Sequence, residues 1–206
     1  MRIFLTLCLL LTALAACKGP QRSQAQSPIS KDYSSDAFTR AAIRQATRLA
    51  HQHRWYLDDA WAYYNSTDSV HRLCLNFRTQ NILELYQARA QLVDVVEELL
   101  QNLKSNPQTS SRLAPNFSAG NLLIRVDFQS FWGIYGDPKY VGWMALENGM
   151  VYYYDFDVKD KQNDQWCNRI ETYNKSKEIA LIEKEAEKEY KDSLPAPKRV
   201  FEYLNE

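Results

Sequence analysis

The sequence predicts one α+β domain that follows a short N-terminal segment. Between residues 36 and 104, apolar residues recur at spacings of three and four, which is the period of a helix. Between residues 120 and 158 they alternate with polar residues, as in strands with one buried face. The helical period returns after residue 166. We therefore expect a long helical hairpin packed on a three-stranded antiparallel β-meander, followed by a charged C-terminal helix.

Two long helices are expected at the start of the domain, which covers residues 36–206. The first spans residues 36–65, places Phe38 and Leu49 on one face, and ends at a cluster of turn-forming residues. The second spans residues 69–104 and has an apolar stripe wide enough for burial on more than one side. Because the link between them is short, the helices should lie antiparallel.

The meander is expected over residues 120–158. Asn148-Gly149 between two apolar runs is a strong hairpin signal and sets Trp143 opposite Tyr154. A tight turn before Tyr140 would also set Trp132 opposite Trp143. The face that carries these large aromatic residues is predicted to pack on the helices. The other face is the predicted binding surface, and it consists of Tyr135, Tyr140, Met144 and Tyr153.

The C-terminal part is predicted to be a helix over residues 166–194, followed by a short apolar tail over residues 195–206. Ile179, Ile182 and Ala186 repeat at helical spacing, while most other positions are lysine or glutamate. Such a mixed charge run is typical of a solvated helix face. The alternative is that this helix covers the aromatic surface of the meander.

The N-terminus has the features of an export signal. Arg2 precedes an uncharged apolar run over residues 3–14, and small residues follow the run. The run is shorter than the roughly 20 residues that a membrane-spanning helix needs. A charged, an apolar and a cleavage region in this order are typical of a secretory signal peptide. We therefore expect residues 1–16 to be removed.

The tetrapeptide Leu14-Ala15-Ala16-Cys17 resembles the lipobox of bacterial lipoproteins. The resemblance implies that Cys17 becomes the first residue and carries a diacylglycerol on its thiol. A second acyl chain on the new amino terminus makes such an anchor stable. In this family an aspartate after the cysteine favours retention in the inner membrane, so Lys18 implies the outer membrane. An ordinary signal peptide with a cysteine near its cleavage site is the alternative.

Residues 17–35 are expected to form the lipidated cysteine and a flexible tether. The tether, residues 18–35, is polar, contains two prolines and has no apolar period. A flexible coil of this length spans about 23 Å on average. A tether of this length would let the domain sit clear of the membrane surface in the cell envelope.

Two cysteines, Cys74 and Cys167, remain after loss of Cys8 with the signal and modification of Cys17. The envelope is oxidising and favours a disulfide between them. Closing so long a loop would add about 4 kcal/mol in the chain-entropy model. Two buried free thiols are the alternative. No paired Cys or Cys/His spacing predicts a metal site.

Charge and motifs exclude several classes of function. The chain has 25 basic and 25 acidic residues, so it lacks the basic surplus typical of a nucleic-acid-binding domain. We find no nucleophile, phosphate-binding or dinucleotide motif, and we expect no cofactor and no catalytic residue. A hydrolase that uses His51 with Asp58, or His53 with Asp59, is the weakest alternative, because each pair would share one helical face.

The sequence thus predicts a lipid-anchored envelope protein with a non-enzymatic structural or protein-binding role. Its expected partners are the membrane, through Cys17, and an envelope protein. The alternative is a carrier of a small apolar ligand. Helices that precede a curved sheet with an aromatic concave face are similar to the cone-shaped domains of the nuclear-transport-factor-like superfamily, and this resemblance implies an apolar cavity.

Overall fold

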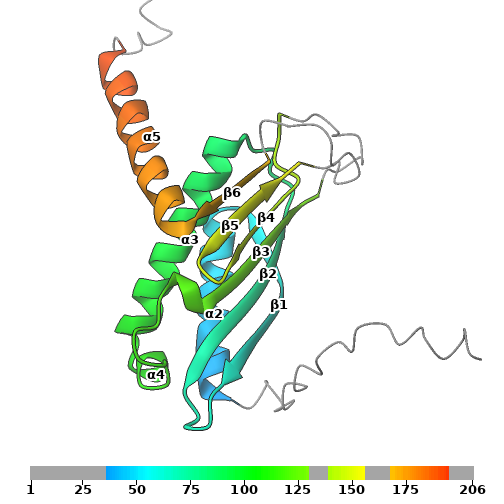
Figure 1. Cartoon of the computed structure of the whole chain (residues 1–206), viewed down its shortest axis with the longest axis vertical. Helices are drawn as coiled ribbons and strands as arrows, with labels where there is room; N and C mark the ends of the chain where they lie inside the picture. Colours follow the sequence, from blue (N-terminus) through cyan, green and yellow to red (C-terminus); the bar gives the residue numbers. More distant parts are fainter. Residues whose placement is uncertain (1–35, 130–138, 156–167, 195–206) are drawn as a thin grey trace, which may run out of the picture. The chain divides into compact units, whose positions relative to one another are not determined.

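The structure is a computed structural model that describes residues 36–129, 139–155 and 168–194 (Figure 1). The predicted α+β class is confirmed, but the arrangement of its elements differs from the prediction. In chain order the elements are α2 (Ala37–Gln52), β1 (Trp55–Tyr64), β2 (Val70–Thr79), α3 (Leu85–Ser105), α4 (Pro107–Ser110), the 3-10 turn η1 (Ala119–Asn121), β3 (Leu122–Phe128), β4 (Trp143–Glu147), β5 (Met150–Tyr154), β6 (Arg169–Thr172) and α5 (Tyr173–Ser193).

Six strands form one mixed sheet whose spatial order follows the chain from β1 to β6. β2 and β3 run parallel because α3 crosses over between them, whereas the other neighbours are antiparallel. α2 and α3 cover one face of the sheet, and α5 packs beside α3 (Figure 1). In the described part of the chain, no helix covers the opposite face.

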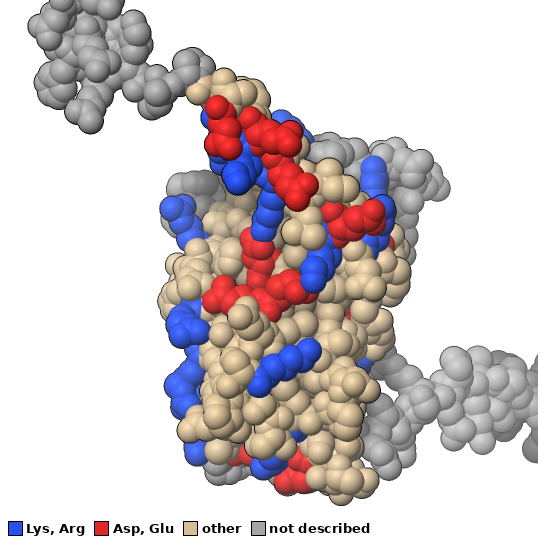
Figure 2. Space-filling view, turned by 90° about the vertical axis from the view of Figure 1, so that its left-hand side faces the viewer, with Lys and Arg blue, Asp and Glu red and all other residues tan. Residues whose placement is uncertain are grey.

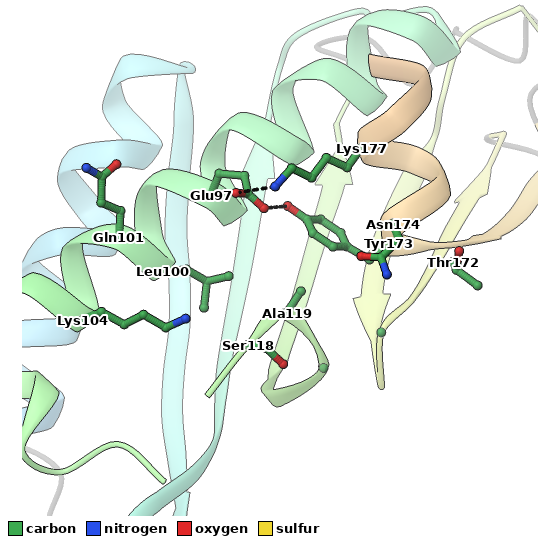
Figure 3. A pocket seen from close by; sticks show the side chains of 12 residues that line it. Glu97, Leu100, Gln101, Lys104, Ser118, Ala119, Thr172, Tyr173, Asn174 and Lys177 are labelled. Carbon is green, nitrogen blue, oxygen red and sulfur yellow. Dashed lines mark hydrogen bonds and ion pairs between the residues drawn. The ribbon is translucent and has the colours of Figure 1, made fainter. Parts of the chain in front are cut away.

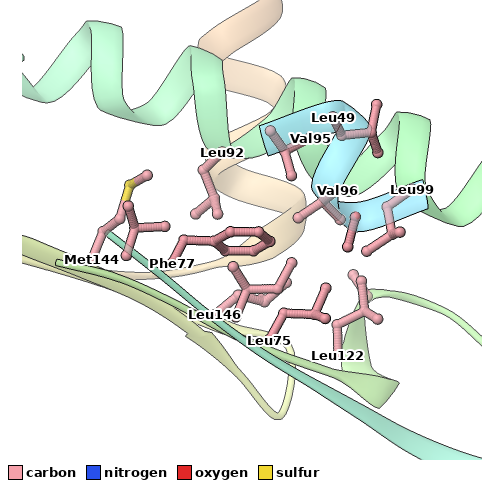
Figure 4. Close-up of a cluster of buried hydrophobic side chains, with 14 of the residues drawn as sticks. Leu49, Leu75, Phe77, Leu92, Val95, Val96, Leu99, Leu122, Met144 and Leu146 are labelled. Carbon is pink, nitrogen blue, oxygen red and sulfur yellow. The ribbon is translucent and has the colours of Figure 1, made fainter. Parts of the chain in front are cut away.

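The core lies between these two helices and the sheet (Figure 4). Leu75 and Phe77 of β2 meet Leu92 and Val96 of α3, and Leu49 adds the contribution of α2. All five are at most 1% exposed. Burying one such side chain contributes about 1.5–3 kcal/mol, so this layer holds the helices on the sheet.

The predicted helical hairpin is wrong, because its first helix ends halfway and continues as a strand. α2 ends at Gln52, and Arg54 follows with a φ of 58°, which breaks the helix. In β1 a bulge between Leu57 and Asp59 interrupts the two-residue alternation. Leu57 and Ala60 therefore both face the core although they are three residues apart, and this spacing imitates that of a helix.

The second predicted helix also begins as a strand. β2 is buried on both faces around Leu73, Cys74 and Leu75, and a short apolar run of this kind fits a strand or a helix equally well. The β1–β2 link is a hairpin in which the Asn65 carboxamide accepts from the amides of Thr67 and Ser69. Only α3, over the second half of the predicted range, is helical.

The Asn148-Gly149 hairpin is confirmed. Glu147 pairs with Met150 and Trp143 pairs with Tyr154, and both turn residues have positive φ, 52° at Asn148 and 74° at Gly149. β3, β4 and β5 do form an antiparallel meander, but it is the middle of a larger sheet. The predicted pairing through Trp132 lies outside the described residues.

The C-terminal helix begins later than predicted, because residues 169–172 form the edge strand β6. The Thr172 hydroxyl then caps α5 by accepting from the Lys175 amide. Tyr173, Ser176 and Ala180 are buried, whereas residues 185–194 are all exposed. The predicted signal peptide, tether and C-terminal tail lie outside the described residues. Within the described ranges, every helix is too short or too polar to cross a membrane.

Candidate binding surface

The predicted binding surface was assigned to the wrong face of the meander. Met144 and Tyr153 are completely buried against the helices, so they are core residues. Tyr140 is half-buried, and Tyr135 lies outside the described residues. Because Val126 and Ile124 of β3 pair with Met144 and Leu146, the face that packs on α2 and α3 runs through these residues.

The physical cause of this error is strand register. The tight turn that was expected would place Trp132 opposite Trp143, whereas Asp127 occupies that position. The observed pairing partner of Trp143 is thus five residues earlier in the chain than the predicted one. Because side chains alternate between the two faces of a strand, a shift by an odd number moves each side chain of β4 and β5 to the opposite face relative to the side chains of β3. The large aromatic residues Trp143, Tyr152 and Tyr154 therefore lie on the side that carries no described helix.

We name this side the open face. It comprises the side chains that point away from α2 and α3 on all six strands, and its rim is well exposed, with Tyr56 at 54% and Ile170 at 59%. Aromatic and apolar residues predominate, with three arginines among them. The open face consists of Tyr56, Asp59, Trp61, Tyr63, Arg72, Cys74, Asn76, Arg78, Leu123, Arg125, Asp127, Trp143, Ala145, Glu147, Met150, Tyr152, Tyr154, Ile170 and Thr172.

An ordered aromatic group lies on the open face where β4 begins and β5 ends. Trp143 stacks on Tyr154 with ring centroids 4.6 Å apart and planes at 22°. The Arg125 guanidinium lies 5.7 Å from the Trp143 centroid, within the range of a cation–π contact. These contacts fix three large side chains before any partner arrives, which lowers the entropy cost of binding.

Cys74 lies on the open face between Trp61 and Leu123, yet it is fully buried by its neighbours. Burial raises the pKa of its thiol to about 11. The thiol is free in this structure. Cys167 lies outside the described residues, so the predicted disulfide stays a prediction.

A second candidate is a groove of about 680 Å³ between α3, the η1 turn and the first turn of α5 (Figure 3). On its wall the Tyr173 hydroxyl donates to Glu97 at 2.8 Å, and the Lys177 ammonium donates to the same carboxylate at 2.8 Å. Burial alone would raise the pKa of Glu97, but these two hydrogen bonds outweigh it and lower the pKa. Burial and the Glu97 carboxylate raise the pKa of Tyr173.

The polar groups on this wall therefore form hydrogen bonds with one another. Glu97 has both oxygens bound, so it is unsuited to act as a general base for a substrate. Lys104 extends into the groove from the next turn of α3, and Gln101 also lines it (Figure 3). We assign this wall mainly to fixing α5 on α3.

A buried ionic network fixes the start of α5 from the other side. Arg89 of α3 is 6% exposed and bonds Glu171 at 3.0 Å and Glu183 at 3.1 Å. The Ser176 hydroxyl donates to Glu171 and lies 3.3 Å from the Tyr153 hydroxyl. The network joins α3, β5, β6 and α5, so its position indicates a structural role.

The histidine alternatives find little support in the geometry. Asp58 and Asp59 are on β1, so the helix that would have aligned them with His51 and His53 does not exist. His51 lines a groove with both aspartates. However, Asp58 is ion-paired with Arg78 at 3.0 Å and Asp59 accepts from the Ala60 amide at 2.8 Å. Neither carboxylate orients an imidazole in the described structure.

A metal site is absent from the described ranges, where no three His, Cys, Asp or Glu side chains cluster. Asp127 pairs with Trp143 at the start of β4, away from the Asn148 turn. Asp127 is exposed on the open face, whereas Asp155 is 2% exposed. The two carboxylates do not converge. Asp157 lies outside the described residues.

Comparison with known proteins gives no relative: no family model, no curated protein and no solved structure matches this chain. The candidate surface therefore depends on the residues themselves. Sequence reasoning missed Trp61 and Arg72, which it placed on helices, and it assigned Trp143 and Tyr152 to the core. The alternation of Leu123, Arg125 and Asp127 with buried residues was the correct signal for β3.

Proposed function

We propose that this chain is a lipid-anchored protein of the bacterial envelope that binds a protein partner through its open face. It has a binding or structural role and is not an enzyme. Cys17 holds it in the outer membrane, and the tether over residues 18–35 connects the anchor to the domain. The membrane part of the proposal rests on the sequence at residues 2–18.

The observation that carries the proposal is the aromatic and arginine-rich open face. Aromatic residues and arginine are the types enriched in protein interfaces, and tryptophan, tyrosine and arginine dominate binding energies there. Trp143, Tyr154 and Arg125 already form a fixed group on this face. A sheet face of this size with no helix across it in the described residues offers a broad, flat contact area, which suits a protein better than a small molecule.

The apolar-carrier alternative finds no specific support. The cone-shaped cavity would lie between the helices and the sheet, where the described side chains form a packed cluster. The groove in Figure 3 is lined by Glu97, Lys104, Lys177 and several polar side chains. Such a lining does not suit an apolar ligand.

Site-specific photo-crosslinking in the producing bacterium tests the proposal. A benzophenone amino acid replaces Tyr152 on the open face of the full chain, and in a matched control it replaces Tyr190, which is 65% exposed on α5. We expect one discrete protein adduct from position 152 and none of that mass from position 190. Adding Arg125→Glu should lower the yield at least about fivefold, since it reverses a charge at the centre of the contact.

Two results would contradict the partner-binding role. One is the absence of an adduct from position 152, and the other is an adduct whose yield is unchanged by Arg125→Glu. The anchor is tested separately with Cys17→Ser. We expect this variant to lose incorporation of labelled palmitate and to leave the membrane fraction.

A further inference from the structure

The exposed side of α2 carries only basic charge. Arg40, Arg44 and Arg48 follow one another at a spacing of four, so they form one exposed stripe along the helix. The 16-residue helix contains no acidic residue. The three guanidinium groups extend over about 12 Å, given the rise of a helix per residue. We name these three residues the arginine stripe.

Helix stability does not explain the arginine stripe. Like charges four residues apart repel each other, and Arg40 lies in the first turn, where the helix dipole favours acids. α5 shows the opposite pattern, with Lys175 paired to Glu178 and Lys191 paired to Glu187. Figure 2 shows acidic and basic side chains interleaved on the side of the molecule that carries α5. Three like charges on one helix face, against the mixed charges of α5, indicate a role in binding.

The position of α2 in the chain indicates the partner. The described domain begins at Asp36, the cap of α2, so the tether from Cys17 ends directly at this helix. A flexible tether that spans about 23 Å on average allows α2 to reach the membrane that holds the anchor. Because the whole chain has zero formal net charge, only a local basic face such as this stripe would orient the domain on an anionic surface.

We propose that the arginine stripe of α2 binds the anionic lipid headgroups of the membrane in which the chain is anchored. The domain then lies with α2 against the membrane, and the stripe supplies the second membrane signal beside the lipid. The neighbouring elements also carry acids near the end of α2: Asp59 of β1 lines a groove with Thr47 and His51, and Glu98 of α3 acts on the charge of His53. This inference rests on the proposed lipid anchor.

The test compares arginine reactivity in two kinds of vesicle. The full lipidated chain is reconstituted in vesicles with 30 mol% phosphatidylglycerol or with phosphatidylcholine alone, treated with phenylglyoxal, and analysed by peptide mass spectrometry. We expect Arg44 and Arg48 to react about tenfold more slowly on the anionic vesicles, because three arginines favour the bound orientation by about two orders of magnitude. Arg169, exposed on β6, is the internal control and should react equally in both.

Added salt and charge-removing substitutions test whether the protection of the arginines is electrostatic. In 0.5 M salt the protection should vanish, since the screening length falls to a few ångströms, about 4 Å. Arg44→Gln with Arg48→Gln should remove the protection of Arg40, whereas Lys188→Gln with Lys191→Gln on α5 should leave it unchanged. Equal rates on both vesicles, or protection that survives high salt, would overturn the proposal.

The proposed lipid anchor and the proposed lipid-binding role of the arginine stripe can be tested separately. Intact mass of the purified chain shows whether Cys17 carries lipid, and an unlipidated chain would contradict the proposed function. In that case a maleimide-linked phospholipid is coupled to Cys17 in a chain with Cys167→Ser, and the same reactivity ratios test the stripe alone.

Discussion

At the scale of single residues, two side chains are held in environments that change their chemistry. Arg89 is a buried cation whose charge is balanced by Glu171 and Glu183. Cys74 is a thiol on the open face that is fully buried. The ion pairs of the Arg89 guanidinium and the low reactivity of the Cys74 thiol therefore exist only in the folded protein.

Arg89→Met should lower the free energy of unfolding by about 3 kcal/mol, because it leaves Glu171, whose side chain is 13% exposed, without its partner. Urea denaturation followed by circular dichroism measures the change. Adding Glu171→Gln should recover part of the loss. Lys191→Met, in an exposed pair with Glu187, is the matched control and should cost about 0.5 kcal/mol or less. Equal losses in Arg89→Met and Lys191→Met would contradict the buried network.

Cys74 should be inert in the folded protein. Its pKa is raised to about 11, so little thiolate exists at pH 8, and burial excludes the reagent as well. We expect Ellman's reagent to react with a Cys8→Ser, Cys17→Ser, Cys167→Ser chain about a hundredfold more slowly in buffer than in urea. Rapid reaction in buffer would show that the open face exposes this thiol.

At the scale of elements, the β4–β5 hairpin shows how a two-residue turn fixes a sheet. Asn148 and Gly149 both adopt positive φ, which the type I′ turn requires and which matches the twist of the strands. The resulting register aligns Trp143 with Tyr154 and so builds the aromatic group of the open face.

Gly149→Ala should therefore cost about 1 kcal/mol in the free energy of unfolding. The added Cβ would meet only Gly120 Cα at 3.9 Å, so the cost comes from the backbone, where φ is 74°. Gly120→Ala is the matched control, since its φ is not in the left-handed region and its Cβ would meet Ser118 Oγ at 3.7 Å. We expect this control to change stability by less than about 0.5 kcal/mol. A larger loss in the control than in Gly149→Ala would contradict this turn geometry.

At the scale of the whole molecule, one core joins α2, α3 and the strands, while the last part of α5 contributes nothing to it. Residues of β2, α3 and β3 belong to a single buried cluster. By contrast, residues 185–194 are all exposed. The molecule therefore combines a cooperative domain with a helix end that depends on local hydrogen bonds alone.

Amide hydrogen exchange should divide the molecule in the same way. We expect amides of residues 185–192 to exchange about a thousandfold faster than those of β2 and α3, because the latter open only when the core unfolds. Residue-resolved exchange measured by NMR at low protein concentration checks this. Equal protection in the two halves of α5 would show that another surface covers its exposed end.

The sequence by itself determined the α+β class, the helix period of α3 and α5, and the register of the Asn148-Gly149 hairpin. Each of these depends on neighbours within a few residues. A turn pair with positive φ, for example, fixes Trp143 opposite Tyr154 wherever the hairpin lies.

Only the tertiary structure decided which face of the sheet is buried. That choice depends on pairing between distant segments: Leu73 of β2 beside Leu122 of β3, and Ile124 opposite Leu146. A register error of five residues moved Met144 and Tyr153 from the predicted surface into the core, because side chains alternate with a period of two. The strands β1 and β2 were missed for a related reason, since the bulge in β1 and the double burial of β2 hide their alternation.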